Sequence, residues 1–384
     1  MLVFIAIALS VYGLANFYIL RRGWQALAGQ PQARWIWLAV FLALVLSFPA
    51  GRFLLGHGQG PLAVLTARVG AFYLAVMLNL IMGVLLVDLL RLVNAFRPFF
   101  PASWSKDPGR TGLALFVLVA GTAALVIAVG AVNAARPRTR EVSLAIDKAA
   151  GGRRNLTMAV VSDIHLGTIA GSSRLRMVVE RTNALHPDIV LMPGDIVDES
   201  VTAREEEAMT SVFQGLRAPL GVFAVPGNHE YFGGLERNLS YLRKWGVRVL
   251  QDEAVLVDGS FYIVGRRDPT ALRYQEVRRP IEVILERSGV DRSLPLILLD
   301  HQPVHLEEAE KAGIDLELCG HTHAGQLFPI NLINKFVYEL NWGPLDKGRT
   351  HYDVTCGVGT WGPPVRTSSR PEIVRIRLTF KESP

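Results

Sequence analysis

Five short apolar runs in the C-terminal part of the chain each end in Asp, Asn or His, and this pattern constrains the fold more than any other feature. Each run has the length and composition of a buried strand. Open α/β sheets bind ligands at the carboxyl ends of their strands. The runs and the polar groups that follow them are Thr157–Ser162 before Asp163-Ile164-His165, Asp188–Pro193 before Gly194-Asp195, Gly221–Pro226 before Gly227-Asn228-His229-Glu230, Leu294–Leu299 before Asp300-His301, and Leu316–Cys319 before Gly320-His321-Thr322-His323. The pattern predicts a sheet with one polar site at the ends of its strands.

Amphipathic stretches alternate with these runs and complete the pattern of an α/β domain. Such alternation predicts helices packed on a mainly central sheet. The predicted helices are Ser173–Leu185, Ala203–Leu216, Leu235–Trp245, Gln275–Ser288 and Val304–Ala312. Arg248–Val257 and Phe261–Gly265 predict a strand pair around the Asp258-Gly259 turn. Glu372–Phe380 alternates apolar and polar residues, as an edge-facing strand does.

The N-terminal part of the chain carries the excess of apolar residues. Half of the 384 residues are hydrophobic, and four apolar runs account for the excess. Each run is near the ~20 residues that cross a bilayer, so we predict about four transmembrane helices, at residues 1–20, 35–50, 70–90 and 111–135. A cleavable signal peptide is the alternative for the first run, but that run lacks a basic start and a small-residue cleavage site. The predicted organisation is a membrane part at 1–135, a linker at 136–154 and an α/β domain at 155–384.

Charge and cysteine content limit which partners and which location can be expected for the chain. The net charge of +6 is scattered, with no block of interleaved bases and aromatics, so we expect no nucleic-acid partner. Asp88 lies three residues before Arg91 and is expected to reach the interface beside that Arg rather than line an ion pathway. Lys and Arg are nearly evenly divided between the two sides of the predicted spans. We therefore expect a multi-pass protein of the cell (inner) membrane. The positive-inside rule does not decide on which side of that membrane the catalytic domain lies. Oligomeric state and a pairing of Cys319 with Cys356 stay open.

The residues at the strand ends have the chemistry of a two-metal site. Residues two apart on an extended chain point to the same side, so Asp163 and His165 can reach one ion together. Asp195, alone at the end of its strand, is placed to bridge two ions about 3.5–4 Å apart. A neutral oxygen and three imidazoles come from Asn228, His301, His321 and His323. This mixture of N and O ligands suits Mn, Zn or Fe better than Ca or Mg, so we expect two divalent transition-metal ions.

The motifs D-x-H, G-D, G-N-H-E, a strand-terminal His and G-H-x-H, in this order, resemble those of the calcineurin-like metallophosphoesterase family. The resemblance implies a four-layered α/β/β/α sandwich after the membrane helices. It implies that one ion is held by Asp163, His165, Asp195 and His323, and a second by Asp195, Asn228, His301 and His321. His229 is implied as the catalytic residue, which protonates the leaving group or stabilises the phosphoryl oxygens and does not bind metal. The segments Gly320–Gln326, Gly357–Gly359 and Pro363–Arg366 resemble the membrane-associated bacterial branch, which includes hydrolases of UDP-2,3-diacylglucosamine.

Four features near these motifs have expected roles outside the set of metal ligands. Asp198 is expected to brace its loop, and Glu230 to orient His229 or a metal-binding residue. Arg366 either grips a substrate phosphate or forms a structural salt bridge. The apolar segment 327–342 either packs on the domain or forms a rim beside the metals that enters the bilayer interface.

The favoured function is hydrolysis of a phosphoester or pyrophosphate bond by a metal-bound hydroxide. The expected partners are the membrane and a phosphorylated substrate, lipid-linked or membrane-proximal. One alternative is a tethered nucleotide or cyclic-nucleotide phosphodiesterase. An alternative of another class is a non-catalytic, metal-stabilised membrane scaffold or sensor, against which the presence of His229 argues.

Overall fold

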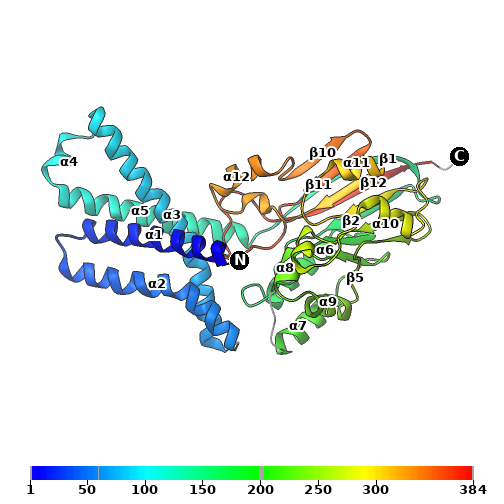
Figure 1. The fold of residues 1–384 in the computed structure, drawn as a ribbon, viewed down its shortest axis with the longest axis horizontal. Coiled ribbons are helices and arrows are strands. Elements are labelled where there is room, and N and C mark those ends of the chain that lie inside the picture. The colour runs from blue at the N-terminus through cyan, green and yellow to red at the C-terminus, as the bar shows by residue number, and fades with distance from the viewer. Residues whose placement is uncertain (1, 59, 199–202, 383–384) are drawn as a thin grey trace. The chain divides into compact units, whose positions relative to one another are not determined.

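The computed structural model describes residues 2–58, 60–198 and 203–382, which form two compact units (Figure 1). The first unit contains the N-terminal helices, and the second is an α/β domain.

The predicted membrane part is helical over the described residues of its apolar runs, apart from Ala135 at the end of the last run. Among the described residues, α2, α3 and α5 are long and apolar enough to cross a membrane. The second predicted span, at 35–50, is longer than expected, because α2 covers 27 residues. The membrane crossing of α1 stays a prediction, and Met1 lies outside the described residues. The helices are α1 (Leu2–Ala26), α2 (Pro31–His57), α3 (Pro61–Phe96), the short α4 (Ala102–Lys106) and α5 (Pro108–Ala134).

Glycines bring the backbones of α2 and α3 together. A Cβ added at Gly51 would lie 2.6 Å from the Cα of Ala67, and one at Gly70 would lie 2.5 Å from the Cα of Phe48. Close approach of backbones over small residues is a common way for helices to associate in lipid, where burial of apolar surface gives no driving force. These contacts fit the predicted membrane location of this unit.

Asp88 of α3 has more partners than the predicted one. Its Oδ1 lies 3.6 Å from Nη1 of Arg91, as the spacing indicated. It also accepts hydrogen bonds from the hydroxyl of Tyr18 and the guanidinium of Arg22, both on α1. The carboxylate therefore joins α1 to α3, which the local sequence did not show.

The α/β unit contains two six-stranded sheets. Strands β2, β3 and β4 pair in parallel, and so do β7, β8 and β9, so each set ends at one edge of its sheet. All five predicted apolar runs are strands of these two sets. In sheet order, the first sheet is β1 (Arg138–Ala149), β12 (Glu372–Lys381), β2 (Asn155–Val160), β3 (Ile189–Pro193), β4 (Val222–Val225) and β5 (Arg248–Val249), and the second is β10 (Gly343–Lys347), β11 (Thr350–Val354), β9 (Leu316–Cys319), β8 (Leu296–Leu299), β7 (Phe261–Gly265) and β6 (Glu253–Val257).

Both faces of each sheet are buried, which gives the predicted four layers. Met158 of β2 packs in a core with residues of the second sheet such as Ile297, whereas its neighbour Ala159 packs in a core with helices. This is the two-residue alternation of a strand covered on both sides. Helices α6 (Ser172–Asn183), α7 (Ala203–Phe213) and α9 (Leu235–Lys244) cover the first sheet, and α10 (Ile281–Arg287) and α11 (Glu307–Ala312) cover the second.

The prediction of a linker at 136–154 is wrong. Most of this segment is β1, which pairs in parallel with β12 along Arg138–Ile146. Its basic residues form ion pairs: Arg140 lies 3.0 Å from the buried Glu372 and 2.7 Å from the buried Asp353. The composition that indicated a linker therefore belongs to an edge strand, since charge is a common protection for a sheet edge.

Two other predicted elements differ from the structure. β12 was predicted to face an edge but lies between β1 and β2, because β1 takes the edge position. The predicted helix Gln275–Ser288 is reduced to α10, which begins after Pro280.

The predicted strand pair around Asp258-Gly259 is confirmed for β6 and β7, with positive φ at both turn residues. However, Arg248–Val249 joins the first sheet as β5.

Candidate metal centre

Five of the eight predicted site residues have a left-handed rather than an extended backbone, whereas Asn228 and His229 begin the short helix α8 (Asn228–Phe232). The φ angles are 54° at Asp163 and His165, 53° at Asp195, 70° at His321 and 49° at His323. The argument that Asp163 and His165 share a side because they are extended is therefore wrong, although both do reach the same site. Left-handed non-glycine residues cost about 1–3 kcal/mol each and cluster at functional sites, where the surrounding structure holds them.

Backbone hydrogen bonds between neighbouring loops hold these conformations. The N–H of Asp163 donates to the carbonyl of Gly194 at 3.1 Å, and the N–H of His165 donates to the carbonyl of Asp195 at 3.1 Å. The N–H of Gly359 donates to the carbonyl of Asp163 at 2.8 Å. The loop after β2 is thus fixed on two sides before any ligand binds.

One group of candidate ligands consists of the buried Asp163, His165 and His323. One potential ligand atom of each lies within 4.8 Å of the others. The Nε2 atoms of the two imidazoles are 2.9 Å apart, and the Nε2 of His323 is 3.5 Å from Oδ1 of Asp163. Three residues that are far apart in sequence therefore present N and O atoms to one point.

A second group contains Asp195, His301 and His321, again within 4.8 Å. The Nε2 of His301 lies 3.1 Å from Oδ2 of Asp195 and 3.1 Å from Oδ1 of Asn228. The same Oδ2 of Asp195 is 3.9 Å from Nε2 of His165 in the first group. Asp195 therefore lies between the two groups, as the sequence predicted for a bridging residue.

The Nδ1 atoms of His301 and His165 have hydrogen-bond partners that determine where the Nε2 atoms of these rings point. The Nδ1–H of His301 donates to the carbonyl of Pro193 at 2.8 Å, and Nδ1 of His165 lies 2.8 Å from Oδ1 of Asp198. With Nδ1 bonded in this way, Nε2 of each ring points into the site, which is the arrangement of metal-ligating histidines. The donor set therefore fits divalent transition metals.

The Nδ1 atom of His323 has a different kind of partner. Nη2 of Arg366 lies 3.1 Å from its Nδ1, and because a guanidinium only donates, this nitrogen accepts. The proton of neutral His323 is then on Nε2, between its ring and that of His165. If an ion bound Nε2 of His323, the proton of the neutral ring would have to lie on Nδ1, which could then no longer accept from Arg366.

Asp198 contacts both His165 and His229. Its Oδ1 pairs with Nδ1 of His229 as well as with Nδ1 of His165. Burial opposes the charged carboxylate, but the two neighbouring imidazoles outweigh it and hold the pKa of Asp198 well below its usual value. Burial likewise opposes protonation of His229, yet the hydrogen bond to Asp198 and the charges of Asp195 and Asp198 raise the pKa of His229 to about 9. Asp198 was expected to brace a loop, and the structure places it at the site itself.

The nearby His321 is shifted in the other direction. Burial, followed by the charge of His301, lowers its pKa to about 3. The imidazole of His321 is therefore neutral at physiological pH, the form that binds metals.

Glu230 organises the backbone around Asp195. Its carboxylate accepts four N–H groups, from Asp195 at 3.0 Å, Ile196 at 2.7 Å, Val197 at 2.9 Å and Gly227 at 2.7 Å. Burial and the charge of Asp195 raise the pKa of Glu230 to about 7. Its bond to the N–H of Asp195 agrees with the expected role in supporting a metal-binding residue, and the other three extend that role to both loops.

Gly227 is required by the space around Asp195. A Cβ at this position would overlap Oδ1 of Asp195 and would lie 2.6 Å from its backbone N and 2.8 Å from Nε2 of His301. The glycine of the Gly-Asn-His-Glu motif thus allows two loops to meet at the centre of the site.

Arg366 and Trp361 complete the surroundings. Arg366 is fully buried and donates to the carbonyls of Cys356, Gly357 and Gly359, so neither the predicted phosphate grip nor the predicted salt bridge describes it.

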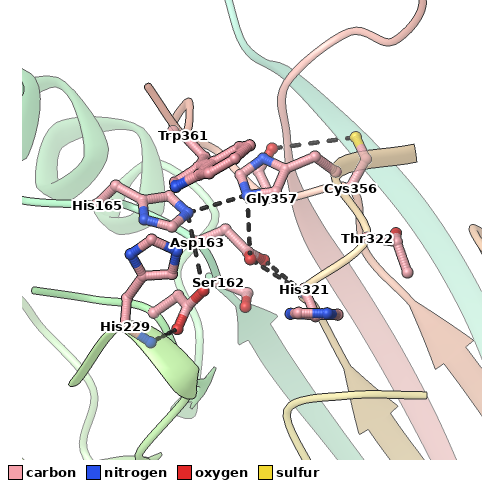
Figure 2. Close-up of polar contacts among 12 residues, drawn as sticks. Ser162, Asp163, His165, His229, His321, Thr322, Cys356, Gly357 and Trp361 are labelled. Atoms are coloured by element: carbon pink, nitrogen blue, oxygen red, sulfur yellow. Dashed lines mark hydrogen bonds and ion pairs between the residues drawn. The ribbon is translucent and has the colours of Figure 1, made fainter. Parts of the chain in front are cut away.

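Trp361 is 57% exposed, and its ring centroid lies 6.2 Å from that of His229. Figure 2 shows it alongside His165, with His229 and Asp163 nearby. Only its place between two motifs, Gly357–Gly359 and Pro363–Arg366, could have indicated Trp361. Both cysteines are buried and free, which answers the question of their pairing.

Comparison with known proteins finds a matching family model and relatives that are named as metallophosphoesterases. The model of the calcineurin-like phosphoesterase family matches residues 156–325. An uncharacterized metallophosphoesterase of Aquifex aeolicus is 37% identical over 224 residues, which cover 57% of this chain and 84% of that protein. A transmembrane protein with metallophosphoesterase domain from Danio rerio is 31% identical over 390 residues, covering 96% of this chain and 87% of that protein. An uncharacterized metallophosphoesterase of Helicobacter pylori strain J99 is 34% identical over 249 residues, and the chain spans 65% of its length, just under two thirds.

Proposed function

Because the chain belongs to the calcineurin-like phosphoesterase family, we propose that it hydrolyses a phosphoester or pyrophosphate bond at a two-metal site. The observation that carries this proposal is the position of Asp195 between two groups of ligand-type side chains. A bridging carboxylate is the feature that distinguishes a two-metal site from two unrelated polar clusters.

The geometry supports the assignment of ligands that the motifs implied. Asp163, His165, Asp195 and His323 would hold one ion, and Asp195, Asn228, His301 and His321 would hold the other. The ions would be Mn, Zn or Fe, given this set of N and O donors. When bound, they would supply Lewis acidity to the phosphoryl group and to the attacking water.

In this proposal His229 is a proton donor and not a ligand. It lies in a group of potential ligand atoms with His165 and Asp195, but its Nδ1 is engaged by Asp198. This pairing orients the ring and supports the protonated form that a general acid needs. The side chain of His229 is partly exposed, which agrees with a role in contacting the leaving group.

The substrate we propose is lipid-linked or membrane-proximal. The three apolar helices and the Danio rerio relative named as a transmembrane protein support a multi-pass location, for which we propose the cell (inner) membrane. The resemblance of Gly320–Gln326, Gly357–Gly359 and Pro363–Arg366 to a branch that includes hydrolases of UDP-2,3-diacylglucosamine favours a glycolipid-type pyrophosphate among such substrates. The exposed Trp361 beside His229 could also stack on a base, and it is the observation that keeps a tethered nucleotide phosphodiesterase as the second candidate.

The test is metal content and hydrolysis by the full-length protein in detergent. Wild-type protein is expected to bind two Mn ions per chain and to cleave a generic aryl phosphate, and a chelator is expected to abolish the cleavage. Asp195→Ala should lose tight metal binding and activity together. The control is Asp147→Ala, which removes an exposed carboxylate on β1 and should leave both unchanged. A metal-loaded but inactive wild-type protein would favour the scaffold, and an active Asp195→Ala would refute the bridge.

A further inference from the structure

The helix α12 (Ile330–Val337) has no buried residue, although most of its side chains are apolar. Phe336 is 92% exposed, Val337 63% and Ile333 57%. Of the two interpretations of segment 327–342, packing on the domain therefore does not describe the helix. An exposed apolar helix next to a site normally has a partner that covers it.

The other side of α12 is attached to the loop that carries His321 and His323. Nδ2 of Asn334 donates to the carbonyl of Thr322 at 2.9 Å, and the hydroxyl of Thr322 donates to the carbonyl of Asn341 at 2.6 Å. The ring centroid of Tyr338 lies 6.1 Å from that of His321. Whatever covers the apolar face is thus held close to the candidate metal centre.

The length of the connection to the membrane part argues that a bilayer is the cover. Helix α5, which is apolar enough to span a membrane, ends at Ala134, and β1 begins at Arg138. Four Cα steps extend at most about 14 Å, so the first residue of β1 stays within that distance of the end of α5. A water-soluble partner has no comparable restraint.

The composition and size of α12 agree with this occupant. Aromatic side chains with a neighbouring Lys, as in Lys335-Phe336, are typical of helices that lie in the headgroup region. An eight-residue helix is only about 12 Å long. It presents much less than the ~800 Å² per partner of a standard protein interface, so a second copy is a poorer occupant.

We propose that α12 inserts its apolar face into the bilayer interface and thereby holds the metal-site loop at the level of lipid headgroups. The substrate is then an amphiphile whose phosphate lies at the membrane surface. The second statement rests on the proposed function, whereas the insertion of α12 does not.

Insertion is tested on the full-length protein in vesicles of phosphatidylcholine and phosphatidylglycerol. Both native cysteines are buried, so Phe336→Cys creates an accessible thiol for an environment-sensitive fluorophore. The matched control is Leu272→Cys, since Leu272 is 64% exposed in the 3-10 helix Pro269–Tyr274. We expect lipid-borne nitroxide to quench the label at 336 and aqueous iodide to quench the label at 272. Equal quenching of both labels by iodide would overturn the insertion.

The substrate class is tested with two diesters that share one leaving group, methyl and hexadecyl p-nitrophenyl phosphate, the latter in the same vesicles. Phe336→Asp should lower the rate on the hexadecyl ester about tenfold or more and leave the methyl ester within about twofold, because only the amphiphile depends on the interface. Leu272→Asp should change neither. Equal loss on both esters with a lower melting temperature would show that α12 is structural, and no loss on either would refute the amphiphile. If wild-type protein cleaves the aryl phosphate and neither ester, the amphiphilic substrate is refuted. If it cleaves none of the three, the proposed function fails, and the quenching experiment still decides the insertion.

Discussion

Removal of the Asp198 carboxylate should impair the site in two separable ways. One oxygen of Asp198 pairs with both His165 and His229. A hydrogen bond to a charged group contributes about 1.5–3 kcal/mol, which corresponds to a factor of roughly 10–150. Asp198→Ala should therefore weaken metal binding through His165, by the ~10–100-fold typical of an outer partner. At saturating metal it should also lower kcat about 10–150-fold through His229.

The assay separates these effects by titrating Mn in the hydrolysis of an aryl phosphate. Asp198→Asn keeps an acceptor oxygen without the charge, so each bond loses only about 1 kcal/mol, or roughly fivefold. In a protein that already carries His229→Ala, Asp198→Ala should still weaken metal binding. It should lower kcat little further, because the imidazole of His229 that Asp198 holds is already absent.

Two results would refute this reasoning. If Asp198→Ala weakens metal binding and leaves kcat unchanged at saturating metal, Asp198 acts only through His165. If its effect on kcat is the same with and without His229, the contact seen between the two side chains has no role in the reaction. A melting temperature equal to that of the wild type is needed for either conclusion.

Three further predictions concern neighbouring residues. His229→Ala should keep its metals while kcat falls about 10²–10⁴-fold, with a smaller loss for substrates that have better leaving groups; loss of metal would make His229 a ligand. Glu230→Gln keeps one acceptor oxygen and should lose two of the four backbone bonds, about 3–6 kcal/mol, so the melting temperature at pH 8 should fall by roughly 6–24 °C. The exposed Glu180→Gln is its control, and equal melting temperatures would contradict the role of Glu230. Gly227→Ala should abolish two-metal binding because its Cβ would overlap Asp195, and retained stoichiometry would show that the loops can move apart.

The sequence alone determined the class of fold and the residues that meet at the site. Buried strands are short and apolar, and the groups after them break that pattern, so the five strand ends were visible without a structure. Parallel pairing then brings those ends to common edges. Local pattern failed where the partner was distant: β1 resembled a linker because the acids that neutralise its arginines, Asp353 and Glu372, lie more than two hundred residues away.

Only the tertiary structure decided how the site is held. The left-handed conformations of Asp163 and His165 depend on backbone bonds to a loop 31 and 30 residues further along the chain, at Gly194 and Asp195. The roles of Asp198 and Arg366 follow from which imidazole nitrogen each one contacts, and sequence spacing carries no information about that. The exposure of α12 was equally hidden, since an apolar stretch has the same composition whether it is covered by protein or by lipid. Residue type sets which interactions are available, and the packing of distant segments decides which of them form.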